Sequence, residues 1–241
     1  MTFIFCSLLQ AQSLKDLNFE YKIRKASPEL KDAPLLVMLH GYGSNEDDLF
    51  DLASTLDPRF TVISLRAPMA LNFGGYGWYH LERKPDKTLL FDYKEAADSR
   101  NKVMRFIRTC CRELKLDSNR VFLLGFSQGT MMSYDIALSY PGRIAGVCAL
   151  SGRLVEESKQ QCKNIKALQT TAFFIAHGTE DEIIPFKEAG LARDFLKSKG
   201  VISIEYNTYT MQHVLNGQEI IALRDWLKRQ LDRSKPSVNK R

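Results

Sequence analysis

Short apolar runs alternate with longer amphipathic segments along most of the chain. Several runs are apolar at every position, and residues 35–39 form the clearest of them. Continuous apolar runs of this length are typical of strands that are covered on both faces. The pattern predicts strands over residues 19–24, 35–39, 61–65, 120–125, 145–150, 172–176 and 202–209.

Amphipathic segments with helical periodicity separate these strands. The predicted helices cover residues 46–55, 94–114, 127–139, 187–199 and 217–231. Strands that alternate with helices form βαβ units, so the fold class is α/β, a mostly parallel sheet flanked by helices. No internal repeat or linker divides the sequence, and we expect a single domain over residues 13–232, an uncertain apolar N-terminal extension (1–12) and a disordered basic tail (233–241).

The helix predicted over residues 46–55 has a candidate capping motif. Ser44 followed by Asp47 matches a variant of the capping box, and Glu46, Asp47 and Asp48 would fill the first turn. A metal site made of these three acids is a weaker hypothesis, because no histidine lies near them and the helix dipole already accounts for them.

Length and charge narrow the class of protein. The 241 residues are 44% apolar, which suits one α/β domain with a substantial core. No stretch approaches the roughly 18 consecutive apolar residues of a membrane-spanning helix, so we expect no integral membrane association. From residue 228 onward six basic residues face one acid, so this segment carries +5 of the net charge of +6. A solvated terminus explains that excess, and we expect no nucleic-acid partner.

Cysteine usage and the N-terminus bear on the compartment. The five cysteines are odd in number and form no C-x-x-C pair, which is typical of reduced thiols in a reducing compartment. Residues 1–9 are apolar and precede Gln10-Ala11-Gln12, yet they lack the positive segment that begins a secretory signal. We therefore expect a cytoplasmic protein, with export as the alternative if residues 1–12 belong to a signal peptide.

The most informative local motif lies at residues 123–129, where an apolar run ends in a G-x-S-x-G turn and a helical pattern follows. Such a turn lifts the hydroxyl of Ser127 to the end of the sheet. Gly125 and Gly129 leave room for the close passage of backbone and helix. The helix that starts after Ser127 aims free N–H groups at any oxyanion beside it, which favours a nucleophilic serine.

A nucleophilic serine needs an imidazole to take its proton. In sheets with this kind of turn, the partners follow in the order serine, acid, histidine. His40 and His80 precede Ser127, and His177 precedes the best candidate acids. His213, just beyond the last predicted strand, is therefore the predicted base.

The acid is expected in the loop after the strand that ends near residue 176. That loop offers Glu180, Asp181 and Glu182. Asp181 is the predicted acid, because its shorter side chain suits a fixed hydrogen bond, and the two glutamates could instead be solvated surface charges.

An oxyanion hole would complete the machinery. One donor is the N–H of Gln128, directly after the nucleophile. The other is expected from residues 39–44, where a buried strand ends in a turn with two glycines, and Tyr42 N–H is the best candidate. An ordinary glycine turn is the alternative.

Together these motifs resemble the phospholipase/carboxylesterase family of α/β hydrolases, which includes the acyl-protein thioesterases. The resemblance covers about residues 35–226 and rests on Leu39-His40-Gly41-Tyr42-Gly43, Arg66-Ala67-Pro68, Gly77-Trp78-Tyr79, Gly125-Phe126-Ser127-Gln128-Gly129, Ser139-Tyr140-Pro141, Leu150-Ser151-Gly152 and His177-Gly178 with Asp181 and Pro185. It implies a single-domain α/β hydrolase with little or no lid, a shallow site, no metal or organic cofactor, and dimers in some members. It also implies the triad Ser127, Asp181 and His213, with oxyanion amides at Tyr42 and Gln128.

The chain departs from this family beside the histidine. The family places glycines on both sides of it, whereas this chain has Gln212 and Val214, which could narrow the cleft or shift the loop. Phe73, Trp78 and Tyr79 are predicted to line an acyl or alcohol pocket, and packing of a loop is the equal alternative.

The predicted function is that of a serine carboxylesterase, which hydrolyses short- to medium-chain esters through an acyl-enzyme intermediate. The alternatives are an acyl-protein or small-molecule thioesterase or lysophospholipase, and a hydrolase-like binder without activity. The expected partners are a small ester or thioester substrate and a second copy in a homodimer.

Overall fold

The computed structural model describes residues 13–14, 17–28, 30–85 and 89–233. The predicted N-terminal extension and the tail beyond Arg233 lie outside these residues, as does Cys6. The other four cysteines carry free thiols. Among the described residues no helix combines the length and apolar character needed to cross a membrane.

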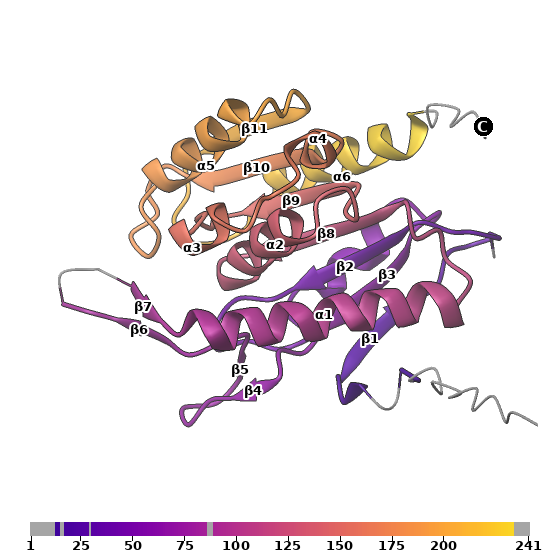
Figure 1. The fold of residues 1–241 in the computed structure, drawn as a ribbon, viewed down its shortest axis with the longest axis horizontal. Coiled ribbons are helices and arrows are strands. Elements are labelled where there is room, and N and C mark those ends of the chain that lie inside the picture. Colours follow the sequence, from indigo (N-terminus) through magenta and orange to yellow (C-terminus); the bar gives the residue numbers. More distant parts are fainter. Residues whose placement is uncertain (1–12, 15–16, 29, 86–88, 234–241) are drawn as a thin grey trace, which may run out of the picture.

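A seven-stranded sheet forms the centre of the molecule (Figure 1). Its order is β1 (Tyr21–Arg24), β3 (Thr61–Leu65), β2 (Leu35–Leu39), β8 (Val121–Phe126), β9 (Gly146–Leu150), β10 (Ala172–Gly178) and β11 (Ile204–Tyr209). Only β1 is antiparallel to its neighbour, and all other pairs in this sheet are parallel. The predicted mostly parallel α/β sheet is therefore confirmed.

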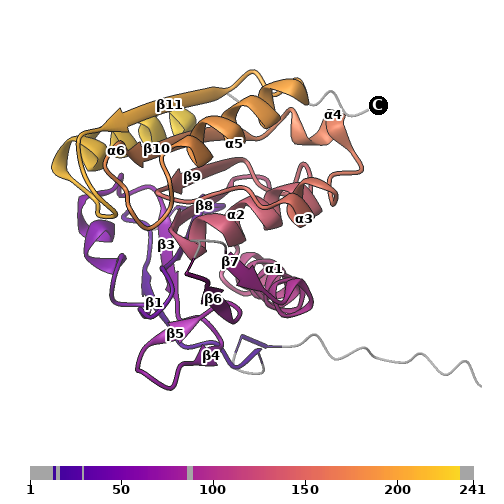
Figure 2. The same ribbon diagram turned by 90° about the vertical axis from the view of Figure 1, so that its left-hand side faces the viewer.

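Helices cover both faces of the sheet (Figures 1 and 2). They are α1 (Tyr93–Glu113), α2 (Gln128–Ser139), α3 (Glu156–Lys159), α4 (Ile165–Leu168), α5 (Lys187–Ser198) and α6 (Gly217–Asp232). Alternate residues of β2 point to opposite faces, as the pleat requires. Val37 packs in the cluster shared with α1, α2 and α5, whereas Met38 packs in the one shared with α6. Burial on both faces explains why β2 is apolar throughout.

The segment after β2 differs from its prediction. Instead of a helix over residues 46–55, a 3₁₀-helix, η2, covers only Phe50–Thr55, and no side chain caps it. Asn45 Oδ1 accepts the Asp47 N–H at 2.8 Å, so the capping box with Ser44 is wrong. Glu46 is buried and both of its carboxylate oxygens accept hydrogen bonds from Arg66, at 2.5 and 2.6 Å. The ion pair with Arg66, not the helix dipole, therefore compensates the charge of Glu46.

A long excursion between β3 and α1 carries two small hairpins that the sequence pattern did not predict. The first pairs β4 (Met69–Ala70) with β5 (Tyr76–Gly77), and the second pairs β6 (Leu81–Arg83) with β7 (Leu89–Phe91). In Figure 1 the second hairpin projects to the left of the sheet, beyond the beginning of α1. Figure 2 looks onto this end of the molecule, toward which the parallel strands run. The excursion therefore borders the carboxyl ends of the strands, where ligands bind in open α/β sheets.

Candidate active site

Ser127 occupies a sharp turn between β8 and α2. Its backbone has φ 54° and ψ −114°, a left-handed φ that residues other than glycine rarely adopt. The Ser127 N–H donates to Leu150 O at 3.0 Å, and its carbonyl accepts the N–H of Thr130 at 3.0 Å. Bonds on both sides hold the strained turn and fix the position of the hydroxyl.

The two glycines of the motif are sterically required. A Cβ on Gly125 would lie 2.3 Å from Gly129 O, and a Cβ on Gly129 would lie 1.8 Å from Leu39 O. Both distances are far below van der Waals contact. The turn can therefore pack against β2 only with glycine at these positions, as predicted from the motif.

The structure brings the three predicted catalytic side chains together. The Ser127 hydroxyl lies 2.9 Å from His213 Nε2, and His213 Nδ1 lies 2.7 Å from Asp181 Oδ2. The rings of Phe126 and His213 pack with centroids 5.0 Å apart. These contacts join the ends of β8 and β10 to the loop after β11.

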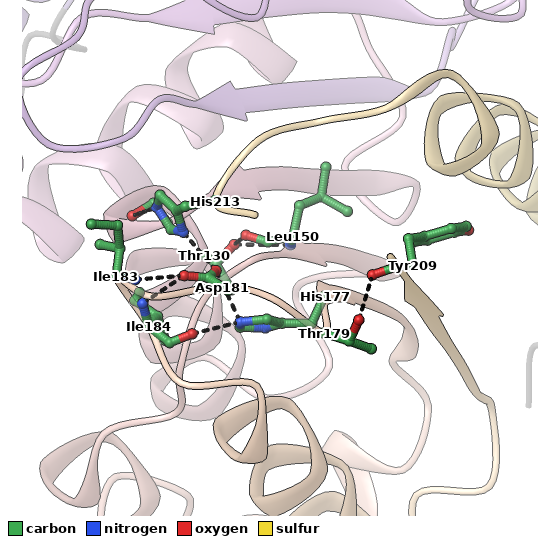
Figure 3. Close-up of polar contacts among 10 residues, drawn as sticks. Thr130, Leu150, His177, Thr179, Asp181, Ile183, Ile184, Tyr209 and His213 are labelled. Carbon is green, nitrogen blue, oxygen red and sulfur yellow. Dashed lines mark hydrogen bonds and ion pairs between the residues drawn. The ribbon is translucent and has the colours of Figure 1, made fainter. Parts of the chain in front are cut away.

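Backbone contacts align the acid loop with the histidine loop. Thr179 N–H donates to Tyr209 O at 2.8 Å, and Glu180 N–H donates to Met211 O at 3.1 Å. A Cβ on Gly178 would lie 2.2 Å from Met211 O, so the two loops approach as closely as a glycine allows. Figure 3 shows Thr179 beside Tyr209 at this junction. The distance between acid and base is thus fixed mainly by the backbone.

Asp181 accepts hydrogen bonds on both carboxylate oxygens (Figure 3). Oδ1 accepts the N–H groups of Ile183 at 2.9 Å and Ile184 at 2.8 Å. Oδ2 lies 2.7 Å from His213 Nδ1 and 3.1 Å from His177 Nε2. Burial raises the pKa of Asp181, but the hydrogen bonds from His177 and His213 outweigh it and hold that pKa well below its ordinary value. The acid is therefore ionised at neutral pH.

The competing candidates are placed elsewhere. Glu180 and Glu182, the alternative acids, are exposed. His40 is buried, accepts the Ala67 N–H at Nε2 and donates from Nδ1 to Gly41 O. His80 is exposed and contacts the carboxylate of Glu95.

The residues expected to form an oxyanion hole lie next to the serine. A Cβ on Gly41 would touch the Ser127 Cβ at 3.4 Å, so the turn after β2 passes directly beside Ser127. Within the described part of the chain, neither Tyr42 N–H nor Gln128 N–H donates to a backbone carbonyl. Both amides are therefore available to a negatively charged oxygen of a substrate.

The side chain of Gln128 anchors the excursion to the turn at Ser127. Its Oε1 accepts the Trp78 N–H at 2.9 Å, and its Nε2 donates to Tyr79 O at 2.8 Å. Trp78 Nε1 in turn donates to His40 O at 2.9 Å. The backbone N–H of Gln128 is also a predicted donor of the oxyanion hole. The same residue therefore connects the excursion to the candidate oxyanion hole.

The three residues predicted to line a substrate pocket lie in two different environments. Trp78 is 1% exposed and Tyr79 is 3% exposed, so both side chains pack in the core and do not line an open pocket. Phe73 is 73% exposed, with its ring 5.9 Å from that of Tyr42. Packing in the core, the alternative, therefore describes Trp78 and Tyr79, whereas the side chain of Phe73 is exposed to solvent beside Tyr42.

A groove that the sequence did not reveal runs beside Tyr42. It has a volume of about 500 Å³, and Tyr42, His80 and residues of the β6–β7 hairpin line it. The hairpin wall includes Leu90 and Phe91, which belong to an apolar run of three residues, too short to predict a strand. The groove offers room for a small molecule next to the turn after β2.

The two residues that flank His213 do not displace it. Gln212 is exposed and Val214 is 52% exposed, while the imidazole keeps both contacts described above. Within the described ranges no group of three or more histidine, cysteine, aspartate or glutamate side chains could hold a metal ion.

Comparison with known proteins places this site in a wider context. The model of the Phospholipase/Carboxylesterase family matches residues 23–231. Acyl-protein thioesterase 1 of Mycosarcoma maydis is 27% identical over 221 residues, which cover 83% of this chain and 92% of the relative. Carboxylesterase SOBER1 of Arabidopsis thaliana is 30% identical over 112 residues, 46% of this chain and 49% of the relative.

Solved structures of the same kind share the fold. The carboxylesterase of Bacillus cereus superimposes with a TM-score of 0.76 at 21% identity, over 90% of this chain and 96% of the other. Acyl-protein thioesterase 2 of Zea mays gives a TM-score of 0.74 at 20% identity, over 88% and 99%. These likenesses confirm the α/β-hydrolase architecture.

Proposed function

The chain belongs to the phospholipase/carboxylesterase family, and we propose that it is a serine carboxylesterase acting on short- to medium-chain esters. One observation carries the proposal, the hydrogen-bonded series from Ser127 through His213 to Asp181 at 2.9 and 2.7 Å. Relatives named carboxylesterase and acyl-protein thioesterase support the same chemistry.

The first half of the reaction forms an acyl-enzyme. His213 Nε2 takes the proton of Ser127 while Oγ attacks the carbonyl carbon of the ester. Asp181 holds the Nδ1–H tautomer of the ring and stabilises the imidazolium that forms. The N–H groups of Gln128 and Tyr42 donate to the oxyanion, and each such donor contributes about 3 kcal/mol to the stability of the transition state.

The acyl-enzyme is complete when the bond from the carbonyl carbon to the leaving oxygen breaks and His213 gives its proton to the departing alcohol. The second half releases the acid. A water loses a proton to His213 and attacks the acyl-serine. The bond to Ser127 Oγ breaks, Oγ recovers its proton, and the carboxylic acid leaves. The groups that exchange protons or bonds in these steps, or bind the oxyanion, are the triad, the two amides and one water.

A thioesterase or lysophospholipase is the second candidate, because relatives that match over nearly their whole length are named acyl-protein thioesterases. The same residues would transfer an acyl group from sulfur. Rates with matched p-nitrophenyl esters and thioesters of increasing chain length distinguish the two. A carboxylesterase favours short- to medium-chain oxygen esters, and a preference for long-chain thioesters would replace that assignment.

Replacement of Ser127 by alanine tests the proposal. The variant should lose turnover of p-nitrophenyl butyrate by roughly 10⁴-fold or more while its circular dichroism and melting temperature stay close to those of the unmodified protein. Ser198→Ala, at the exposed end of α5, is the matched control and should keep full activity.

A fluorophosphonate probe gives an independent readout. It should label the unmodified protein and the Ser198→Ala control but not Ser127→Ala. Turnover that survives in Ser127→Ala would reject the assignment of the nucleophile. Failure of the folded, unmodified protein to label would instead favour the binder without activity.

The expected homodimer and cytoplasmic location also remain proposals. Light scattering of the purified protein tests the first, and cell fractionation with an antibody tests the second.

A further inference from the structure

His177 lies at the end of β10, is 1% exposed and faces the carboxylate of Asp181 (Figure 3). We propose that His177 is a positioning residue for the acid, and that it donates a hydrogen bond which keeps Asp181 ionised and directed at His213. The inference rests on the proposed function, since it assigns a role within the same reaction.

The hydrogen-bond partners define the state of the ring. His177 Nε2 lies 3.1 Å from Asp181 Oδ2 and 3.0 Å from Ile184 O. A carboxylate and a carbonyl can only accept, so Nε2 must carry a proton. Ile184 belongs to the same loop as Asp181 and follows it closely in the chain. His177 therefore shares one N–H between the acid and the backbone of the loop that carries the acid.

The surroundings of Asp181 show what this donor adds. Its side chain is fully buried, and a buried carboxylate without donors takes up a proton. Ile183 and Ile184 supply two N–H groups to Oδ1, so Oδ2 depends on the two histidines. A protonated or rotated Asp181 could no longer accept from His213 Nδ1 in the geometry that the base needs.

Packing alone does not require an imidazole at this position. The ring of His177 meets that of Phe186 edge-on, with centroids 6.3 Å apart. Its Nδ1 is buried, and it has no hydrogen-bond partner among the described residues. An apolar side chain would fill the site without leaving a buried polar atom of its own unpaired. The donor at Nε2 is therefore what the imidazole contributes.

A double-mutant cycle tests whether His177 acts through Asp181. His177→Leu removes the donor, and His177→Gln keeps an N–H close to the position of Nε2. His177→Leu should lower kcat for p-nitrophenyl butyrate roughly tenfold to a hundredfold with KM unchanged, and His177→Gln should restore most of kcat. In an Asp181→Ala background, His177→Leu should change kcat less than about twofold.

Three outcomes would overturn the proposal. They are an unchanged kcat in folded His177→Leu, no rescue by glutamine, and an equal loss of kcat with and without Asp181. If His177→Leu does not fold, His177→Met replaces it in the same cycle.

A readout without substrate separates this proposal from the proposed function. The proton between His213 Nδ1 and Asp181 should give a low-field NMR resonance that His177→Gln keeps and His177→Leu shifts or broadens. An identical resonance in His177→Leu would refute the role of His177. Loss of the proposed esterase function would instead appear as an unmodified protein that turns over no ester while this resonance behaves as expected.

Discussion

The turn at Ser127 requires a residue without a Cβ atom at position 129. Gly129 lies against the carbonyl of Leu39, which belongs to β2 and cannot move without disturbing the centre of the sheet. A methyl group at this position would push α2 away from β2. The hydroxyl of Ser127 and the amide of Gln128 would move with the helix.

Gly129→Ala should therefore reduce both stability and activity. We expect the free energy of unfolding to fall by roughly 3 kcal/mol, because overpacking a rigid site costs about this much. We expect kcat to fall about a hundredfold, since a displacement near 1 Å is enough for such a loss. Urea unfolding and p-nitrophenyl butyrate turnover measure the two effects.

Gly217→Ala is the control for this substitution. Gly217 opens α6, and an added Cβ would meet nothing within 4 Å. The variant should keep its activity and unfold at the same or a slightly higher urea concentration. Equal behaviour of the two variants would refute the steric explanation.

Sequence order indicated which three side chains the structure brings together, because each of them comes within four residues of the end of a strand. Other residues of the site carry no such signal. The contact between His177 and Asp181 depends on how the acid loop folds back, and the sequence shows only that His177 precedes the acid. The burial of Trp78 follows from hydrogen bonds to Gln128 and His40, which lie far away in the chain.

At the scale of elements, the helix dipole and burial have opposite effects on the charge of Glu219 at the beginning of α6. Glu219 lies in its first turn, where the helix dipole favours a negative charge by up to about 2 kcal/mol. The side chain is 0% exposed, and neither carboxylate oxygen has a hydrogen-bond partner among the described residues. Burial dominates and raises the pKa of Glu219 to about 8, although the nearby backbone N–H of Asn216 lowers it.

Glu219→Gln should stabilise the protein in a pH-dependent way. The folded-state pKa of about 8 exceeds the ordinary value of 4.5, so the unfolded state binds fewer protons between these values and stability falls as pH rises. Glutamine has the same shape without this penalty. The gain should be near zero at about pH 4 and on the order of 4 kcal/mol above about pH 8, measured by urea unfolding.

Glu180→Gln, at an exposed acid, provides the comparison for this titration. Its unfolding free energy should follow that of the unmodified protein across the whole pH range. A gain in Glu219→Gln that is constant with pH would contradict the assigned cause.

Apart from the segment after β2, elements with their own periodicity were predicted to within two residues at each end, and β2 and β3 match their predicted ranges. The hairpins between β3 and α1 were missed because distant contacts define them. Gly43 N–H donates to Tyr76 O, and Tyr76 N–H donates to Ser44 O, so β5 is held by the turn after β2. Four-residue helices such as α3 are too short for any periodic signal.

At the scale of the whole molecule, Arg66 ties together segments that are far apart in sequence. Its guanidinium pairs with Glu46 after β2 and with Glu20 before β1, and it stacks on the ring of Tyr76 at 4.7 Å. The hydrogen bonds from Arg66 outweigh burial and hold the pKa of Glu46 below its ordinary value of 4.5. This ion pair braces the excursion beside the candidate site.

Arg66→Met should lower the free energy of unfolding by about 2 kcal/mol at neutral pH, because it leaves Glu46 buried without its partner. Since the folded-state pKa of Glu46 is depressed, the stabilisation is present above pH 4.5 and is lost as pH falls below it. The difference between the two proteins, followed by urea unfolding, should therefore shrink toward about pH 3.

Arg105→Met, at an exposed position on α1, is the matched control and should remain within about 0.5 kcal/mol at every pH. A deficit in Arg66→Met that persists undiminished in acid would show that packing of the arginine stem, not its charge, supports the fold.

The base of the candidate triad comes from the far end of the sheet. His213 follows Ser127 by 86 residues and is held only when β11 has paired with β10. During synthesis the N-terminal segments leave the ribosome first, so most of the sheet can form before this imidazole has emerged. We therefore expect the nascent chain to lack the proposed hydrolytic activity until its last edge strand is added, so that competence arrives in one late step of maturation.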